Sequence, residues 1–263
     1  MAPNDADQLL WAGDLDGARR ALVEVVRSRP ADEQARMFLF QLLAVAGEWD
    51  KAKAQLQLLA QLSPEAQMLS MAYGQAVDAE RERAAVWAGA TRLHLLQDSD
   101  WAIGLVDAVE HYGQGRAEQG DAARDAAFEA APDTPGTLDG VSFDWIADAD
   151  GRFGPSFEAI IGGRYGLVPF DTVARLKSDG PRDLRDTVWY PAQIFLKSGQ
   201  SVAALLPSRY PGSEAAAEVD ERLGRVTGWR ETDAGEVGSG QHLWTLSTGE
   251  DRDLLSTRLL AFD

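Results

Sequence analysis

One short acidic segment carries the residues of this sequence best suited to metal binding. Asp148 and Asp150 could direct two carboxylates at a hard cation, and Glu158 follows as a more distant oxygen donor. Asp144 lies just before this pair. The segment therefore raises one enzymatic alternative, a metal-dependent hydrolase that uses Asp144, Asp148 and Asp150.

The spacing of this segment departs from that of a calcium-binding loop. Such a loop needs a further oxygen ligand where Arg152 stands and a glycine where Phe153 stands. The competing interpretation is that the aspartates cap backbone amides or form ion pairs with Arg152 or Arg164. We favour this structural interpretation and predict no metal site.

The other residue types needed for catalysis are scarce or scattered. The chain has no cysteine, and its three histidines, His94, His111 and His242, are far apart in the sequence. Neither a Gly-x-Ser-x-Gly nucleophile elbow nor a Walker-type phosphate loop is found. The glycine-rich stretch 161–166 lacks the dinucleotide-binding fingerprint and is better explained as a turn. The sequence therefore predicts no catalytic residues, no cofactor and no enzymatic activity.

The charge of the chain excludes one class of partner. Its formal net charge is −17 at pH 7, whereas nucleic-acid-binding proteins need clustered lysine and arginine. Asp5 and Asp7 stand where a secretory signal would carry basic residues, and no apolar run approaches the length of a membrane span. We expect a cytoplasmic protein that binds neither nucleic acid nor membrane.

Two segments that lie 34 residues apart share one pattern. The run Gly13-Asp14-Leu15-Asp16-Gly17-Ala18 is repeated in kind by Gly47-Glu48-Trp49-Asp50-Lys51-Ala52, and the same offset relates Leu22 to Leu56 and Pro30 to Pro64. Thirty-four residues is the tetratricopeptide period. Each unit is predicted to be a helix pair, with the first helix ending at the glycine and the second ending before the proline.

Stacked helix pairs of this kind form a concave surface lined by their first helices. We predict that the first helix of the second repeat, within 32–46, contributes Arg36, Phe40 and Gln41 to a partner-binding groove. A further helix is expected to begin at Pro64, with Ser63 as its N-cap, and to run towards Trp87.

The character of the sequence changes near residue 132, where alanine-rich helical patterns give way to short segments punctuated by glycine and proline. We predict two domains, a tetratricopeptide-like helical domain at 1–132 and a compact α+β domain with a mainly antiparallel sheet at 133–263. Within the second domain, we expect short helices at 155–161 and 213–222. Strands are expected at 188–196, 202–206, 241–247 and 254–262.

The stretch 206–213 predicts a rigid turn. It presents Arg209 and Tyr210, which are residue types favoured at protein interfaces. Together with Arg152, these residues form a second candidate surface for partner binding. A turn with no role in binding is an equally good explanation.

Several motifs are similar to those of one protein family. The runs Phe143-Asp144-Trp145-Ile146-Ala147-Asp148 and Pro207-Ser208-Arg209-Tyr210-Pro211-Gly212-Ser213 are the most specific, and Gly47-Glu48-Trp49 adds to them. On these residues the chain resembles the ImpE/TagJ family of type VI secretion accessory proteins, also called SciE-type virulence proteins. The likeness spans nearly the whole length.

The resemblance implies a non-enzymatic cytoplasmic adaptor. Such a protein binds the N-terminal helix of the small sheath subunit of a contractile secretion system, and is thereby linked, indirectly, to the Clp-type ATPase that recycles the sheath. The resemblance supplies no catalytic residues. Alongside the hydrolase, a self-associating scaffold remains an alternative, and a homodimer stays open.

Overall fold

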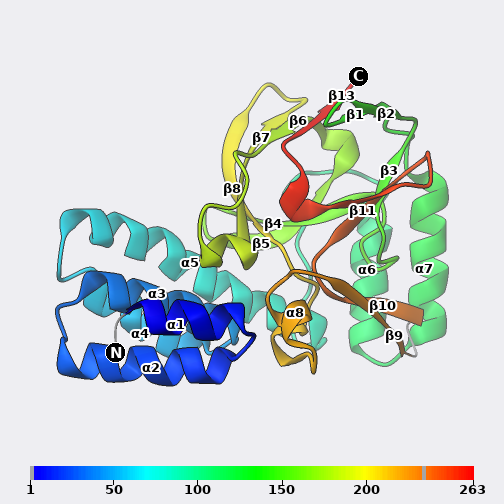
Figure 1. Ribbon diagram of the computed structural model, residues 1–263. Helices are drawn as coiled ribbons and strands as arrows, with labels where there is room; N and C mark the ends of the chain where they lie inside the picture. The colour runs from blue at the N-terminus through cyan, green and yellow to red at the C-terminus, as the bar shows by residue number, and fades with distance from the viewer. Residues whose placement is uncertain (1–2, 233–234) are drawn as a thin grey trace.

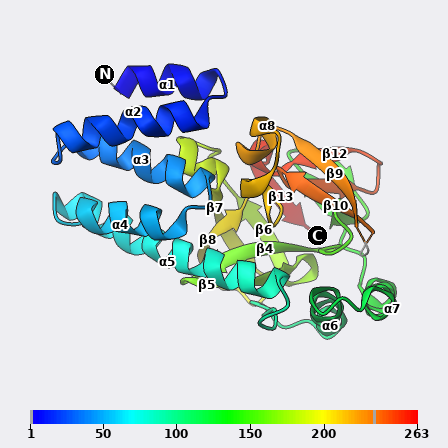
Figure 2. The same cartoon turned by 90° about the horizontal axis from the view of Figure 1, so that it is seen from below.

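The computed structural model describes residues 3–232 and 235–263. Its N-terminal part is an array of five antiparallel helices that stack in chain order (Figures 1 and 2). They are α1 (Pro3–Trp11), α2 (Leu15–Ser28), α3 (Glu33–Val45), α4 (Trp49–Leu59) and the longer α5 (Pro64–Trp87). The predicted helix pairs and the predicted helix from Pro64 to Trp87 are confirmed.

The turns of the array follow the local signals in the sequence. Gly13 and Gly47 adopt φ angles of +80° and +67°, a left-handed conformation that favours glycine, and each ends the first helix of a pair. Asp14 accepts a hydrogen bond from the Gly17 amide at 2.7 Å, and Ser63 accepts one from the Ala66 amide at 3.2 Å. These glycines and caps explain why the 34-residue pattern could be read from the sequence.

A second helix pair lies beside the sheet, away from the array (Figure 2). It consists of α6 (Ala102–Gly113) and α7 (Ala117–Ala130), which are joined by a turn at Gly115 with φ of +71°. The short link from α5 to α6 is fixed to the sheet, because residues 94–96 bond to the backbone of Leu167.

The C-terminal part is built around one eight-stranded sheet with the order β2-β1-β13-β6-β7-β8-β4-β5, in which every neighbouring pair is antiparallel. The strands are β1 (Gly136–Leu138), β2 (Val141–Phe143), β4 (Ser156–Ile161), β5 (Arg164–Pro169), β6 (Val173–Lys177), β7 (Trp189–Leu196), β8 (Ser201–Pro207) and β13 (Leu259–Phe262). The predicted α+β class, antiparallel sheet and 188–206 hairpin are confirmed.

Smaller sheets and short helices complete the C-terminal part of the described chain. One three-stranded sheet joins β3 (Ile146–Asp148), β11 (Leu243–Leu246) and β12 (Asp251–Asp253), and a ribbon joins β9 (Thr227–Thr232) to β10 (Gly235–Gly240). The helix expected at 213–222 is broken into the 3₁₀ turn η3 (Ser213–Ala215) and α8 (Val219–Arg222). Further 3₁₀ turns are η1 (Phe170–Thr172), η2 (Leu184–Thr187) and η4 (Leu254–Ser256).

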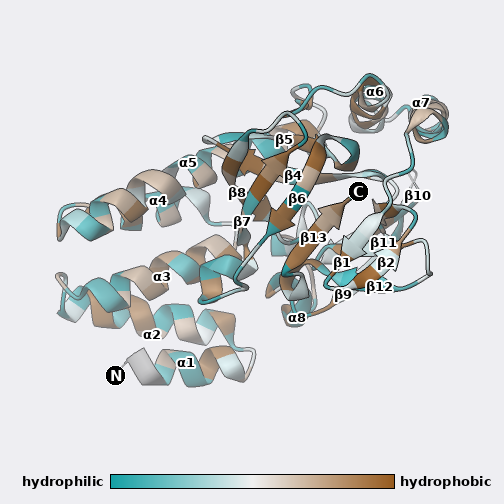
Figure 3. Ribbon diagram, turned by 90° about the horizontal axis from the view of Figure 1, so that it is seen from above, coloured by the Kyte–Doolittle hydropathy of each residue, from teal (hydrophilic) through white to brown (hydrophobic). Residues whose placement is uncertain are grey.

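The prediction of a helix at 155–161 is wrong, because these residues form β4. This strand lies between β8 and β5 and is buried on both faces, so its sequence lacks the alternation of a half-exposed strand. Gly162 and Gly163, with φ of +59° and +79°, form the two-residue turn of the hairpin to β5 rather than a helix end. The strands around β4 are among the most hydrophobic segments of the molecule (Figure 3).

The helical array and the sheet share one hydrophobic core. Phe40 of α3 and Tyr73 of α5 pack against Trp189 of β7, with ring centroids 6.3 and 5.7 Å apart. Trp49 of α4 lies 5.9 Å from the same ring. The predicted boundary at residue 132 falls between α7 and β1, and the division into two domains at that point stays a prediction.

Among the described residues, no helix combines the length and the apolar composition that a membrane span requires.

Candidate functional site

The array and the sheet are also joined by buried charged residues. Arg83 of α5 donates two hydrogen bonds to Glu158 of β4, at 2.7 and 2.5 Å. His242 lies between two carboxylates, with Nε2 at 2.9 Å from Glu158 and Nδ1 at 2.7 Å from Asp148 of β3. Tyr210 donates to the other Asp148 oxygen at 2.8 Å. We call these five residues, all of them buried, the buried charged cluster.

The cluster holds its histidine as an imidazolium. Burial by itself lowers the pKa of His242, but the carboxylates of Asp148 and Glu158 outweigh it and raise this pKa to about 9. Burial likewise opposes ionisation of Glu158, yet Arg83 and His242 hold its pKa well below the ordinary value. Burial raises the pKa of Asp148, although His242 opposes this shift. The imidazolium can then donate one hydrogen bond to each carboxylate.

Two tryptophans extend the cluster to the surrounding core. Trp189 donates its indole N–H to Glu80 of α5 at 2.9 Å, and burial raises the pKa of this glutamate. Trp87 donates to the hydroxyl of Tyr165 at 2.9 Å, and Tyr165 donates in turn to Glu158 at 2.5 Å. Because these partners come from both parts of the molecule, the cluster fixes α5 against the sheet. Its closed, buried position indicates a structural role.

The acidic segment 144–150, which the sequence suggested for metal binding, contains two buried aspartates that bond to other groups of the chain. Asp150 is buried and accepts hydrogen bonds from the guanidinium of Arg152 at 2.6 Å and from the Gly238 amide at 2.8 Å. Asp148 belongs to the cluster, and Asp144 is exposed. Within residues 3–232 and 235–263, no group of three or more acidic, histidine or cysteine residues is arranged to hold a metal ion. The geometry supports the interpretation of an ion pair with Arg152.

Most of the residues predicted to contact a partner have internal partners. Phe40 is buried against Trp189, and Arg36 is buried with its guanidinium on the Gln55 side chain at 2.9 Å. Gln41 is also largely buried, at the edge of a groove described below. The concave surface predicted for a partner is therefore filled, around Phe40, by the chain's own β7. Partner binding by these three residues stays a prediction.

The second predicted surface is also largely internal. Arg209 donates to the carbonyls of Val45, at 2.9 Å, and Arg222, which lie at the C-terminal ends of α3 and α8. Burial lowers the pKa of Arg209 to about 10. Tyr210 belongs to the buried charged cluster, and the half-buried Arg152 lines a pocket of about 370 Å³. A contact between these residues and a partner remains a prediction.

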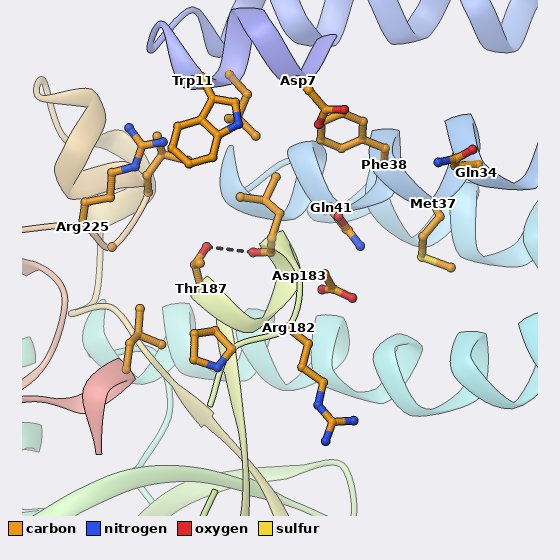
Figure 4. A pocket seen from close by; sticks show the side chains of 16 residues that line it. Asp7, Trp11, Gln34, Met37, Phe38, Gln41, Arg182, Asp183, Thr187 and Arg225 are labelled. Atoms are coloured by element: carbon orange, nitrogen blue, oxygen red, sulfur yellow. Dashed lines mark hydrogen bonds between the residues drawn. The ribbon is translucent and has the colours of Figure 1, made fainter. Parts of the chain in front are cut away.

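An open groove of about 890 Å³ lies between the array and the sheet, and we call it the junction groove (Figure 4). One wall comes from α1 and α3, and the other comes from the segment around η2 and from the loop after α8. Its lining includes Asp7, Leu10, Trp11, Gln34, Met37, Phe38, Gln41, Arg182, Asp183, Leu184, Thr187, Leu223, Arg225 and Leu255.

Trp11 is the most exposed of the large apolar side chains that line the groove. It is 81% exposed, the highest value among the large apolar side chains of the described chain, and the Arg225 guanidinium lies 6.0 Å from its ring. Trp11 ends α1 and stands outside the apolar stripe that packs the repeats. No motif or spacing in the sequence selects it, because its exposure results from how α1 packs in the folded chain.

The wall opposite α3 is held in place by local bonds. Thr187 donates its hydroxyl to the Leu184 carbonyl at 2.8 Å (Figure 4), and Asp183 accepts from the Arg185 amide at 3.1 Å. The Arg185 guanidinium lies 4.8 Å from the ring of Tyr73 in α5. The groove therefore has a preformed shape, which lowers the entropic cost of binding.

A helical-repeat array joined to an antiparallel sheet, with an open groove between them, defines a class of helical-repeat proteins whose concave surfaces commonly bind other proteins. The model of the ImpE protein family matches residues 140–260, and that of a tetratricopeptide repeat matches residues 9–72. A Pseudomonas aeruginosa protein named type VI secretion system accessory component TagJ is 41% identical over 98% of this chain and 91% of its own length. The chain belongs to the ImpE family, as its motifs predicted.

The same fold occurs in a crystal structure of a Vibrio parahaemolyticus protein. The TM-score is 0.87 at 21% identity, with 98% of this chain and 97% of the other covered. The likeness extends across both the array and the sheet, so their arrangement is a property of the fold.

Proposed function

We propose that this protein is a non-enzymatic, cytoplasmic adaptor of a type VI secretion system. In this proposal it binds the N-terminal helix of the small sheath subunit in the junction groove and is thereby linked, indirectly, to sheath recycling by the Clp-type ATPase. The relative from Pseudomonas aeruginosa, which is named as an accessory component of such a system, supports this role.

The junction groove is the observation on which the proposal rests. Leu10, Trp11, Met37 and Phe38 make the wall from α1 and α3 largely apolar. Arg182 and Asp183 add charge on the opposite wall (Figure 4). An amphipathic helix binds such a groove by placing apolar side chains, at helical spacing, against the apolar wall. Exposed apolar side chains that line a groove also indicate a site of interaction with another protein.

Substitution of Trp11 by glutamate tests the proposal. Tryptophan is enriched among the interface residues whose loss costs about 2 kcal/mol or more, so we expect about 30-fold weaker binding of a peptide that carries the N-terminal helix of the sheath subunit. Isothermal titration calorimetry on the full chain measures the change. Because Trp11 is exposed, the thermal unfolding of the variant should be unchanged.

Trp145→Glu is the matched control, because this tryptophan is 43% exposed and lies on the sheet side of the molecule, outside the lining of the groove. It should leave the affinity unchanged. Equal loss in both variants, or full affinity in Trp11→Glu, would contradict binding in the junction groove.

A further inference from the structure

The N-terminal half of α5 presents a second apolar surface, away from the junction groove. Met68 and Met71 are 77% and 66% exposed, the highest values after Trp11 among the large apolar side chains of the described chain. Both belong to the N-terminal half of α5, the last helix of the array, and no helix of the described chain lies on the side of this half that faces away from α4 (Figure 2). Methionine side chains of this kind adapt readily to a partner surface.

A small hollow lies beside these methionines. It has a volume of about 240 Å³, and Leu56, Ala60, Ser70, Met71 and Gly74 help to line it. A Cβ atom at Gly74 would meet no other atom of the described chain within 4 Å, so nothing within the fold requires a glycine there. A glycine inside a helix is unfavourable, and an open one next to two exposed methionines provides room for an incoming side chain.

The pattern of residues around Met71 is close to symmetric. Met68 and Gly74 each lie three residues from Met71, and Gln67 and Gln75 each lie four residues from it. Positions three and four apart share one face of a helix. If two copies of α5 pair in an antiparallel manner with Met71 at the centre, Met68 of each faces Gly74 of the other. Gln67 of each copy then faces Gln75 of the other copy, at the two ends of the paired segment.

We propose that this face of α5 binds a second copy of the same chain and forms a two-fold symmetric dimer. A two-fold interface must be self-complementary, with residue i of one copy against residue j of the other and the reverse. A protruding Met68 and a hollow at Gly74 on one face meet this condition.

The distribution of charge supports a second copy as the occupant. A chain with a net charge of −17 repels its own copies over most of its surface, but the segment 67–75 contains no charged residue. Beyond the glutamines, Glu65 of one copy would approach Asp78 of the other. Lys53 binds both carboxylate oxygens of Asp78 at 2.6 Å, and the Arg81 guanidinium lies 3.0 Å from the same carboxylate. These two cations reduce the repulsion between Asp78 and Glu65 of the other copy.

Analytical ultracentrifugation of the full chain tests the dimer. We expect a species of twice the 28.5 kDa chain mass at micromolar concentration, and at least a ten-fold weaker association for Met71→Glu. Ile103→Glu is the control, because Ile103 is 52% exposed on α6, outside the proposed interface, and it should leave the dimer intact. A chain that is monomeric at every concentration would overturn the proposal. A dimer that Met71→Glu does not weaken would overturn it too.

Cysteine cross-linking tests the register, since the natural chain has no cysteine. Met71→Cys should form a disulfide-linked dimer under mild oxidation, because position 71 meets itself at the two-fold axis. Met68→Cys should cross-link efficiently only when Gly74→Cys is also present. Equal cross-linking by Ile103→Cys, or none by Met71→Cys, would overturn the proposed pairing.

Discussion

Replacement of Glu158 by glutamine is expected to lower the free energy of unfolding by about 3–5 kcal/mol, the range typical of a broken buried ion pair. The change preserves the shape of the side chain but leaves Arg83 and His242, both buried and charged, without their common counter-charge. Urea unfolding followed by circular dichroism measures the effect. The loss should appear as a lower transition midpoint with an unchanged slope.

Glu129→Gln is the matched control for this substitution. Glu129 is exposed on α7, so the same chemical change there should alter the stability by less than about 0.5 kcal/mol. Comparable losses in the two variants, or a small loss in Glu158→Gln, would show that the buried charged cluster does not fasten α5 to the sheet.

The second large effect is expected in the dependence of stability on pH. His242 has a pKa of about 9 in the folded chain, compared with about 6.5 in an unfolded chain. Its contribution to stability is therefore fully present below pH 6.5 and is lost as the pH rises through 9. At 1.36 kcal/mol per pKa unit, the upper bound of this loss is about 3 kcal/mol.

The loss of stability at acid pH comes from a group whose pKa is lowered in the folded chain, and not raised as in His242. Since the pKa of Glu158 lies well below its ordinary value, its contribution is present above about pH 4.5 and disappears as the pH falls. The raised pKa of Asp148 offsets part of this loss, because Asp148 takes up a proton earlier in the folded state. The stability should therefore be highest between about pH 5 and 6.5, between the pKa values of the unfolded groups.

His242→Gln identifies the source of the alkaline loss. Urea midpoints measured from pH 6 to 9 should fall clearly for the natural chain and much less for this variant, which is already destabilised at pH 6. His111→Gln, at a half-buried position on α6 outside the cluster, should retain the natural profile. An unchanged alkaline slope in His242→Gln would contradict a buried imidazolium.

The parts of the fold that were predicted correctly are those encoded locally. Gly13 and Gly47 mark helix ends because their positive φ angles favour glycine, and Ser63 and Pro64 start a helix through an N-cap and a fixed φ angle. Such signals act within a few residues, and their recurrence at 34 residues reveals the repeat.

The predictions that failed or fell short depended on long-range packing. Pro155 and Gly162-Gly163 predict a short helix where the chain forms β4, and burial of this strand on both faces removes the alternation by which a strand is recognised. Proline, glycine and serine around Arg209 and Tyr210 predict a turn that presents these side chains, whereas the folded chain buries both of them.

The buried charged cluster could not be found by spacing at all. His242 lies 94 residues from Asp148 and 84 from Glu158, and only the folded sheet and α5 bring these side chains together. The junction groove has the same origin, because its walls come from α1, α3 and the distant segment around η2.

Hydrogen–deuterium exchange on the full chain, with and without a synthetic peptide of the sheath subunit's N-terminal helix, tests the adaptor role most directly. We predict slower exchange in the segments 7–11, 34–41 and 181–187, which line the junction groove, and no change in α7. Protection confined to other segments, or none at peptide concentrations that saturate binding, would contradict the groove as the partner site. Absence of binding altogether would contradict the adaptor role itself.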